Sequence, residues 1–452
     1  MTGLITYKGW SLSEMPPLTD KVAVITGGSS GIGREITAQL LLHDVKKVYI
    51  LGRSQDKYHK SLLEWSEKKG IKTENSTTRT TFVKCDLTDV NDVKRVAETL
   101  SSQLERLDML FCNAAISTFE PYGLSPQGIE TMFAANYVGH FTLTMLLLPL
   151  LERTAGLMAT SSSPTAPRIV VATSSLHMAC RELDFAALTS PTPTKWPPQL
   201  ESPWRYARSK LADILFTRQL ARRLEKRGHG QASSKIYVNT YFPGNVPTEA
   251  MDSWKDGLGL LLGTAMKSVF YVLGQGVQDG AAGALFLGTA REVEENDLRG
   301  RYFIPIATED RTSALGEDMD LARNLWSWTE QKVRETLGDA WLDEPKEKVE
   351  VKDDGEKVEK KVEKKAEKKA EKKAENKFDS ARVDGQQVDE GPKVSRMRKF
   401  DGAPKFDGEK GYGEAENRKE EVPQRKLDVQ GGGDAGEKEA IHMDSNYSPI
   451  AY

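Results

Sequence analysis

Seven short runs of β-branched and other apolar residues recur between positions 20 and 306, separated by segments of helical length. Each run is nearly continuous, which is the pattern of strands that are covered on both faces. Strand–helix alternation of this kind builds a parallel sheet with right-handed crossovers. The sequence therefore predicts an α/β fold, a single doubly wound domain with a seven-stranded, mostly parallel sheet. The expected strands are Lys21–Ile25, Lys47–Leu51, Thr81–Cys85, Met109–Cys112, Arg168–Ala172, Lys235–Tyr241 and Arg301–Ile306.

Charge and aromatic residues set the limits of this domain. Residues 345–452 hold 25 Lys+Arg and 26 Asp+Glu, and their one leucine is Leu427, whereas all eight tryptophans lie between Trp10 and Trp341. A segment with so few apolar residues cannot bury a core. We expect an N-terminal extension at 1–18, a folded domain at 19–342, and a disordered, low-complexity, Lys/Glu-rich tail at 343–452.

Composition also excludes several classes of protein. With 63 Lys+Arg against 66 Asp+Glu, the chain lacks the basic surface that a nucleic-acid binder needs. Cys85, Cys112 and Cys180 form neither a disulfide framework nor a metal-ligand pattern, so no metal site is expected. The N-terminus has no basic segment followed by an apolar run, and Phe141–Leu151 is too short to span a bilayer. A cytoplasmic protein is the expectation.

The first expected strand runs directly into a glycine-rich turn, TGGSSGIG at positions 26–33, and a helix follows at once. Glycine permits the tight turn, lets the backbone approach a pyrophosphate, and allows the helix to pack closely on the strand. No Gly-Lys-Ser/Thr follows, so the turn is not a P-loop. It predicts a Rossmann-type dinucleotide site, with cofactor-binding residues Gly27, Ser29, Ser30, Gly31, Ile32 and Gly33.

Two residues at later strand ends bear on the choice of dinucleotide. Sites that prefer NAD place an acidic residue after the second strand, but this chain has Arg53, which can pair with a 2′-phosphate. We therefore favour NADP(H) over NAD(H), although Arg53 as a solvated loop residue remains an alternative. Asp86 suits a hydrogen bond to the adenine amino group, or it caps the next helix.

A tyrosine and a lysine stand one helical turn apart in Tyr206-Ala-Arg-Ser-Lys210. Free tyrosine has a pKa near 10, and an adjacent cation favours the phenolate. The spacing alone is common, so its weight comes from the order in which further polar residues accompany it. That order is the glycine turn, Asn113, Asn136, Ser175, Tyr206, Lys210 and Pro243-Gly244.

This ordered set resembles the short-chain dehydrogenase/reductase family, in particular its retinol-dehydrogenase-like branch and the fungal light-induced alcohol dehydrogenase group. The likeness covers roughly Leu18 to Trp341. It rests on the glycine turn and on six further motifs, CDLTD at 85–89, CNAA at 112–115, NYVGHF at 136–141, SS at 174–175, YARSK at 206–210 and PGNVPT at 243–248.

The resemblance implies a role for each matching residue. Tyr206 is the general acid/base, Lys210 lowers its pKa and binds ribose, and Ser175 polarises the substrate carbonyl. Asn136 would hold a water that links Lys210 to solvent. The resemblance also assigns three residues to the cofactor, with Asn113 lining the adenine-ribose side and with Val246 and Thr248 closing over the nicotinamide and pyrophosphate.

The chain departs from the family pattern in three places. The usual Asn-Asn-Ala-Gly reads Cys112-Asn-Ala-Ala115. Ser174 is an alternative to Ser175, and the interval from Ser175 to Tyr206 is lengthened by a Pro/Trp-rich insertion. Simpler readings also stay open, because Asn136 can tie two strands together. Two lone histidines, His140 and His177, are interpreted as structural or solvated.

The main functional hypothesis is an NADP(H)-dependent dehydrogenase or reductase that interconverts a hydrophobic alcohol and its ketone or aldehyde. The apolar segment Leu258–Leu273 suggests a lid that selects a lipophilic substrate. Alternatives are a tailoring reductase of secondary metabolism and a non-catalytic NADP(H)-binding interaction protein. A weak membrane-surface contact through the same segment and a homodimer are further options that the sequence leaves open.

Overall fold

The computed structural model describes residues 9–118, 121–157, 165–189, 198–227, 235–247 and 275–342. The predicted tail 343–452 and the predicted lid Leu258–Leu273 lie outside these residues, as does Thr248.

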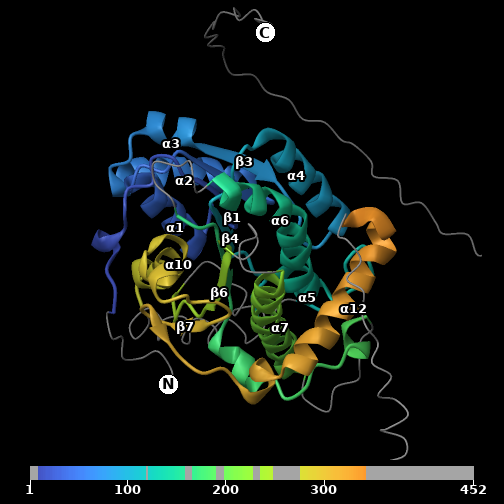
Figure 1. Cartoon of the computed structure of the whole chain (residues 1–452). Coiled ribbons are helices and arrows are strands. Elements are labelled where there is room, and N and C mark those ends of the chain that lie inside the picture. The colour runs from blue at the N-terminus through green and yellow to red at the C-terminus, as the bar shows by residue number, and fades with distance from the viewer. Residues whose placement is uncertain are drawn as a thin grey trace, which may run out of the picture. The chain divides into compact units, whose positions relative to one another are not determined.

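One sheet organises the described residues, in the order β3-β2-β1-β4-β5-β6-β7-β8 (Figure 1). Strands β1 to β7 are parallel and confirm the seven predicted runs. The prediction of seven strands is nevertheless corrected to eight, because a two-residue strand pairs antiparallel with β7. Two residues are too few to carry an apolar pattern. The strands are β1 Val22–Thr26, β2 Lys47–Gly52, β3 Thr80–Lys84, β4 Met109–Cys112, β5 Arg168–Ala172, β6 Tyr237–Tyr241, β7 Tyr302–Ile304 and β8 Thr308–Glu309.

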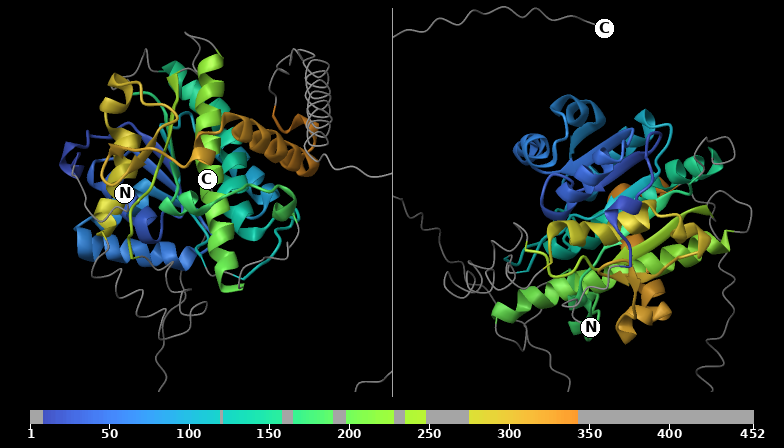
Figure 2. Two further views of the ribbon diagram at one scale, coloured as in Figure 1. Left: turned by 90° about the horizontal axis from the view of Figure 1, so that it is seen from below. Right: turned by 90° about the vertical axis from the view of Figure 1, so that its left-hand side faces the viewer.

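Helices cover both faces of the sheet. Figures 1 and 2 show α1 and α10 on one face, with α4, α6 and α7 on the other and α12 lying against α7. The α-helices are α1 Gly31–Leu42, α2 Gln55–Lys69, α3 Thr73–Arg79, α4 Val90–Gln103, α5 Thr131–Phe133, α6 Gly139–Gly156, α7 Pro198–Lys226, α10 Val277–Thr289, α11 Glu292–Glu295 and α12 Met319–Leu337. Shorter helices are η1 Leu12–Glu14, η4 Ser175–Ala179, η5 Ala186–Leu188, η8 Ala314–Glu317 and η9 Asp339–Trp341, and η2 Ala134–Val138 is a π-helix.

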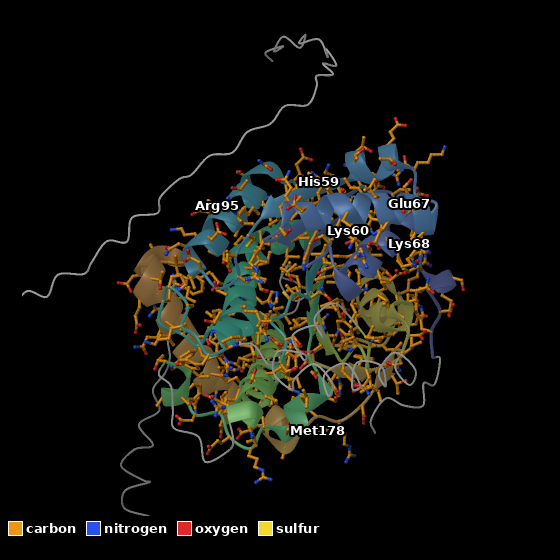
Figure 3. All side chains as sticks on the ribbon, turned by 180° about the vertical axis from the view of Figure 1, so that it is seen from behind. His59, Lys60, Glu67, Lys68, Arg95 and Met178 are labelled. Atoms are coloured by element: carbon orange, nitrogen blue, oxygen red, sulfur yellow. The ribbon has the colours of Figure 1, made fainter. Side chains whose placement is uncertain are left out.

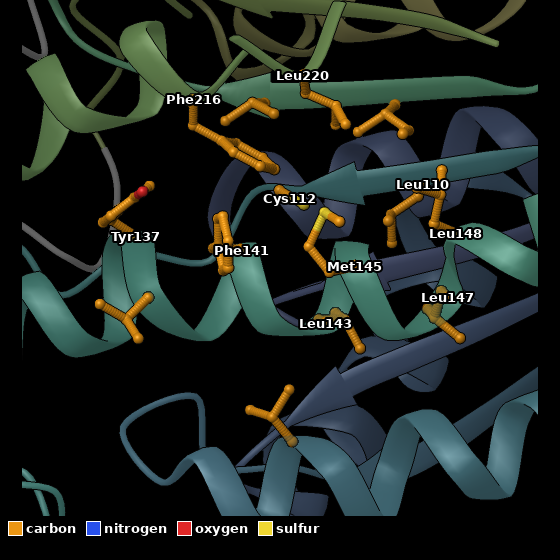
Figure 4. Close-up of a cluster of buried hydrophobic side chains, with 14 of the residues drawn as sticks. Leu110, Cys112, Tyr137, Phe141, Leu143, Met145, Leu147, Leu148, Phe216 and Leu220 are labelled. Carbon is orange, nitrogen blue, oxygen red and sulfur yellow. The ribbon is translucent and has the colours of Figure 1, made fainter. Parts of the chain in front are cut away.

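The larger core cluster lies between the sheet and helices α4, α6, α7 and α12. Figure 4 shows α6 directing Phe141 and Met145 toward β4 and α7, where they meet Cys112 and Phe216. The helical stretch Thr131–Gly156 is long and apolar enough to cross a membrane by composition, yet 89% of its most apolar window is buried inside the protein. It is therefore packed as a core helix.

A second cluster fills the opposite face and includes residues that precede β1. Trp10, Met15 and Leu18 are buried there, and the Trp10 ring meets Phe286 of α10 edge to face at 5.7 Å between centroids. Part of the segment predicted as an extension, residues 1–18, thus packs against the domain.

Candidate active site

The strand order reverses between β1 and β4, because β2 lies on one side of β1 and β4 on the other. Crossover helices leave such a point in opposite directions, so a crevice opens beyond the carboxyl ends of these strands. The glycine turn begins there, directly after β1. Gly27 and Gly31 adopt φ of +68° and +49°, which favour glycine. A Cβ at Gly33 would collide with the carbonyl oxygen of Gly27 and with the Asn113 side chain, so this position requires glycine as well.

The first turn of α1 is suited to an anion. Its N-cap Ser30 makes no side-chain capping bond. Within the described part of the chain, the amides of Gly31, Ile32 and Gly33 donate to no protein acceptor. Helices α2 and α4, in contrast, are capped by Ser54 and Asp89. Free amides at a helix N-terminus fit a pyrophosphate, so this observation agrees with the predicted dinucleotide.

Arg53 and Asp86 follow β2 and β3 at the same edge of the sheet. Arg53 is exposed, and none of the described acidic residues pairs with it. Asp86 accepts through Oδ1 from the amide and hydroxyl of Thr88. The capping alternative for Asp86 is wrong, because Asp89 is the residue that caps α4.

Lys210 is fastened to the end of β5. Its buried Nζ donates to the carbonyl oxygen of Ala172 at 2.9 Å, and the Thr173 hydroxyl donates to the Lys210 carbonyl oxygen at 2.7 Å. Tyr206 lies one turn earlier on α7 and is half-buried, with its ring centroid 5.7 Å from the Lys210 ammonium. The predicted Tyr–Lys pair therefore lies on one helical face at the carboxyl end of the sheet.

The two adjacent serines have different surroundings. Ser174 is the N-cap of η4, and its hydroxyl accepts from the amide of Leu176 at 3.2 Å. The Ser175 hydroxyl makes no hydrogen bond to another described residue, and η4 packs against α7. A free hydroxyl on the segment that packs against the Tyr206 helix supports the choice of Ser175 over Ser174.

Asn136 is fully buried in the π-helix η2. Its side chain accepts from the amide of Ile116 at 2.7 Å and donates to the Ile116 carbonyl at 3.1 Å and to Ser209 Oγ at 3.0 Å. It thus joins the segment after β4 to α7. The sequence left open that Asn136 ties two strands together. The structure shows that it instead joins a loop to a helix.

His140 is a functional candidate that sequence reasoning treated as structural or solvated. It is buried, its Nδ1 lies 2.8 Å from the Asn136 carbonyl oxygen, and its Nε2 lies 2.8 Å from Thr26 Oγ1. A carbonyl only accepts, so Nδ1 carries the proton and Thr26 donates to Nε2. Thr26 Oγ1 also accepts from the amides of Asn113 and Ala114, both at 2.9 Å. Burial lowers the pKa of His140 to about 4.

Asp213 was missed by sequence reasoning. Its Oδ2 accepts from Lys210 Nζ at 2.9 Å, and both side chains are almost completely buried. The signal was present, since the two residues stand three apart on a helix and therefore share a face. Burial raises the pKa of Asp213 to about 7. Desolvation lowers the pKa of Lys210, but the combined effects of Asp213, Tyr206 and Cys112 raise it, so that the net shift is upward.

Of the remaining predicted cofactor residues, Asn113 lies beside the glycine turn and Val246 lies against α10. Asn113 donates from Nδ2 to the Thr26 carbonyl at 3.1 Å and so lies beside the glycine turn. Val246 is buried against Gly280 of α10, which also approaches Ile32. Thr248 lies outside the described residues. The described residues contain no cluster of three His, Cys, Asp or Glu side chains that could hold a metal ion.

Fold and site together define a dinucleotide-binding oxidoreductase of the doubly wound α/β type, and comparison with known proteins agrees. A family model described as short chain dehydrogenase matches residues 21–175. An uncharacterized oxidoreductase of Schizosaccharomyces pombe is 36% identical over 313 residues, covering 68% of this chain and 83% of that one. A short chain dehydrogenase/reductase of Colletotrichum higginsianum is 32% identical, covering 72% and 78%.

The chain belongs to the short-chain dehydrogenase/reductase family. A crystal structure of an uncharacterized protein from Mycobacterium paratuberculosis shares the fold, with a TM-score of 0.51 and 23% identity, covering 72% of this chain and 98% of that one.

Proposed function

We propose that this oxidoreductase is NADP(H)-dependent and interconverts a hydrophobic alcohol and its ketone or aldehyde, with Tyr206 as the acid/base. The observation that carries the proposal is the position of Lys210. Its ammonium is held on the end of β5 by Ala172 and lies 5.7 Å from the Tyr206 ring. This places a charged amine and a phenol at the sheet edge where the glycine turn leaves its amides free.

When bound, NADPH would supply a hydride to the carbonyl carbon, and the free amides of the glycine turn and Arg53 would hold the cofactor. Tyr206 donates its hydroxyl proton to the carbonyl oxygen, so that the carbonyl, one hydride and one proton together give the alcohol. Ser175, whose hydroxyl is free, donates a hydrogen bond to that oxygen. Lys210 stabilises the phenolate that remains, and a proton from solvent restores the phenol.

The preference for NADP(H) is supported by Arg53. Its exposed guanidinium follows β2 and is unpaired among the described residues, so it is available to a 2′-phosphate. An acidic residue at this place would instead repel the phosphate.

A lipophilic substrate is supported by the surface next to Ser175. Leu176 and Met178 follow it on η4 and are 39% and 53% exposed. Figure 3 shows Met178 at the edge of the molecule. Exposed apolar side chains on the short helix that carries Ser175 favour an apolar substrate body.

The test is Tyr206→Phe in purified protein, assayed with NADPH on a panel of lipophilic aldehydes and ketones. Loss of a general acid is expected to lower kcat by about 100-fold or more. NADPH binding, followed by fluorescence, is expected to persist. Tyr49→Phe, on β2 away from the crevice, is the matched control and is expected to keep full activity.

Unchanged turnover in Tyr206→Phe contradicts the proposal. Binding of NADPH by the wild-type chain without turnover of any carbonyl would instead favour the non-catalytic, NADP(H)-binding alternative.

A further inference from the structure

Lys210 and Asp213 form a buried ion pair next to the Tyr206 ring. The Lys210 ammonium has three N–H groups, and two acceptors lie at 2.9 Å, the Ala172 carbonyl oxygen and Asp213 Oδ2. One N–H therefore remains for the phenol or for a ribose hydroxyl. The position of the ammonium is set jointly by the end of β5 and by Asp213.

Only one oxygen of the Asp213 carboxylate, Oδ2, accepts a hydrogen bond. Its Oδ1 is buried and has no hydrogen-bond partner. A buried carboxylate with an unsatisfied oxygen is costly, and buried ion pairs in general add little to stability. An asparagine would hold the same ammonium at a lower desolvation cost, so stability alone does not account for a carboxylate at this position.

We propose that Asp213 is a positioning residue of the active site, which anchors the Lys210 ammonium beside the Tyr206 ring and opposes its positive charge, and so sets the pH dependence of proton transfer to a carbonyl oxygen. The inference rests on the proposed function, because it assigns Tyr206 the role of proton donor. It favours carbonyl reduction over alcohol oxidation near neutral pH.

Other titratable groups around Lys210 do not share this role. Cys112 of β4 has a pKa raised by burial to about 12, and burial also raises the pKa of Tyr137 in η2. His140 of α6 has a pKa lowered by burial to about 4. None of the three changes charge between pH 5 and pH 10. Asp213, with a pKa raised by burial to about 7, does.

The kinetic test compares the wild-type chain with Asp213→Asn in the pH profile of kcat/KM, using the aldehyde or ketone that the wild type reduces fastest and the corresponding alcohol. Removing the carboxylate leaves the Lys210 charge unopposed. Loss of one nearby unit charge in the interior of a protein shifts a proton equilibrium by on the order of one pH unit. The midpoint for alcohol oxidation is expected to move down by this amount, and the reducing activity is expected to be lost at correspondingly lower pH.

Two variants separate this effect from a structural one. Asp213→Glu keeps the charge and is expected to restore the wild-type midpoint. Asp108→Asn removes the carboxylate from another buried Lys–Asp pair, formed with Lys21 at the opposite end of the sheet. It is expected to leave the midpoint unchanged, although it also removes a buried charge.

A second measurement uses the cofactor-free protein. Because the folded-state pKa of Asp213 is raised, its stabilising contribution is present at low pH and is lost as the pH rises through about 7. The melting temperature of Asp213→Asn is therefore expected to rise relative to the wild type by a few degrees between pH 5 and pH 8. If Asp213→Asn does not fold, the same comparison is made with Asp213→Ser.

The outcomes distinguish the two proposals. An active wild type, an inactive Tyr206→Phe and an unshifted midpoint in a folded, neutral Asp213 variant overturn the role of Asp213 and leave the proposed function standing. A pH-independent difference in melting temperature also counts against it. A wild type that turns over no carbonyl or alcohol overturns both.

Discussion

At the scale of single residues, the site depends on a few polar side chains that are completely buried. His140 is an example, because it connects the Asn136 carbonyl to Thr26 and through Thr26 to the segment after β4. One neutral imidazole with a defined tautomer thereby joins the π-helix to the end of β1. Replacing His140 removes this link between Asn136 and Thr26.

Acid sensitivity is the expected consequence of burying His140. Its pKa is about 4 in the fold against 6.5 when exposed, so the unfolded chain binds the proton more tightly and the fold loses stability as the pH falls below 6.5. Between pH 7 and pH 5 this group is expected to cost about 2 kcal/mol of unfolding free energy.

Denaturant unfolding of the wild type and of His140→Asn at the two pH values measures this. The variant loses the bond to Thr26 and is expected to be less stable by about 1–3 kcal/mol at pH 7. Between pH 7 and pH 5 the variant is expected to lose about 2 kcal/mol less unfolding free energy than the wild type loses. Parallel pH dependences in the two proteins would contradict the assignment.

At the scale of elements, the junctions between strands and helices decide what the crevice can hold. Helix α1 begins with free amides, whereas α2 is capped by Ser54, the residue that follows Arg53. The first junction fits a pyrophosphate, and the second presents the cation that we propose for contact with a 2′-phosphate. The proposed preference for NADP(H) therefore depends on the β2–α2 junction.

Arg53→Ala tests this junction. Loss of a charge-assisted contact is expected to raise the Kd for NADPH about tenfold or more and to leave the Kd for NADH nearly unchanged. Fluorescence titration with both cofactors measures the two values. Lys60→Ala, which removes another exposed cation from the α2 region (Figure 3), is the control and is expected to change neither. An equal rise in the Kd for NADPH and for NADH would show that Arg53 does not contact the 2′-phosphate.

At the scale of the whole domain, α12 packs on the outer side of α7 and adds its apolar residues to the larger core cluster. Trp326 packs edge to face on Phe141 of α6 at 5.0 Å and stacks on Phe216 of α7 at 6.0 Å, and the guanidinium of Arg223 lies 4.2 Å from its ring. Helix α12 thus covers α7, the helix that carries Tyr206, Lys210 and Asp213. Homodimerisation stays a prediction, and a dimer formed through α6 and α7 would have to accommodate α12.

Trp326→Ala is expected to lower the unfolding free energy by about 3–5 kcal/mol, because it opens a cavity among buried aromatic side chains. Ser327→Ala, on the exposed side of the same helix, is expected to change it by less than about 0.5 kcal/mol. Urea unfolding followed by circular dichroism measures both. A small loss for Trp326→Ala would mean that α12 contributes little to the domain.

Much of the architecture was predictable because it is local and periodic. Continuous apolar runs identify strands that are covered on both faces, and a glycine turn at the end of the first strand identifies a dinucleotide site. Both signals depend on neighbouring residues in the chain. The Tyr206–Lys210 pair was likewise readable, because residues four apart share a helical face.

Other features were decided only by the tertiary structure. Whether Asp213 neutralises Lys210, whether His140 joins Asn136 to Thr26, and which serine is free for a substrate depend on groups brought together from distant parts of the chain. Burial changes their proton affinities, and burial is a property of the packed domain. The sequence by itself determined which side chains could react, and packing decided their charges, their partners and their access to the crevice.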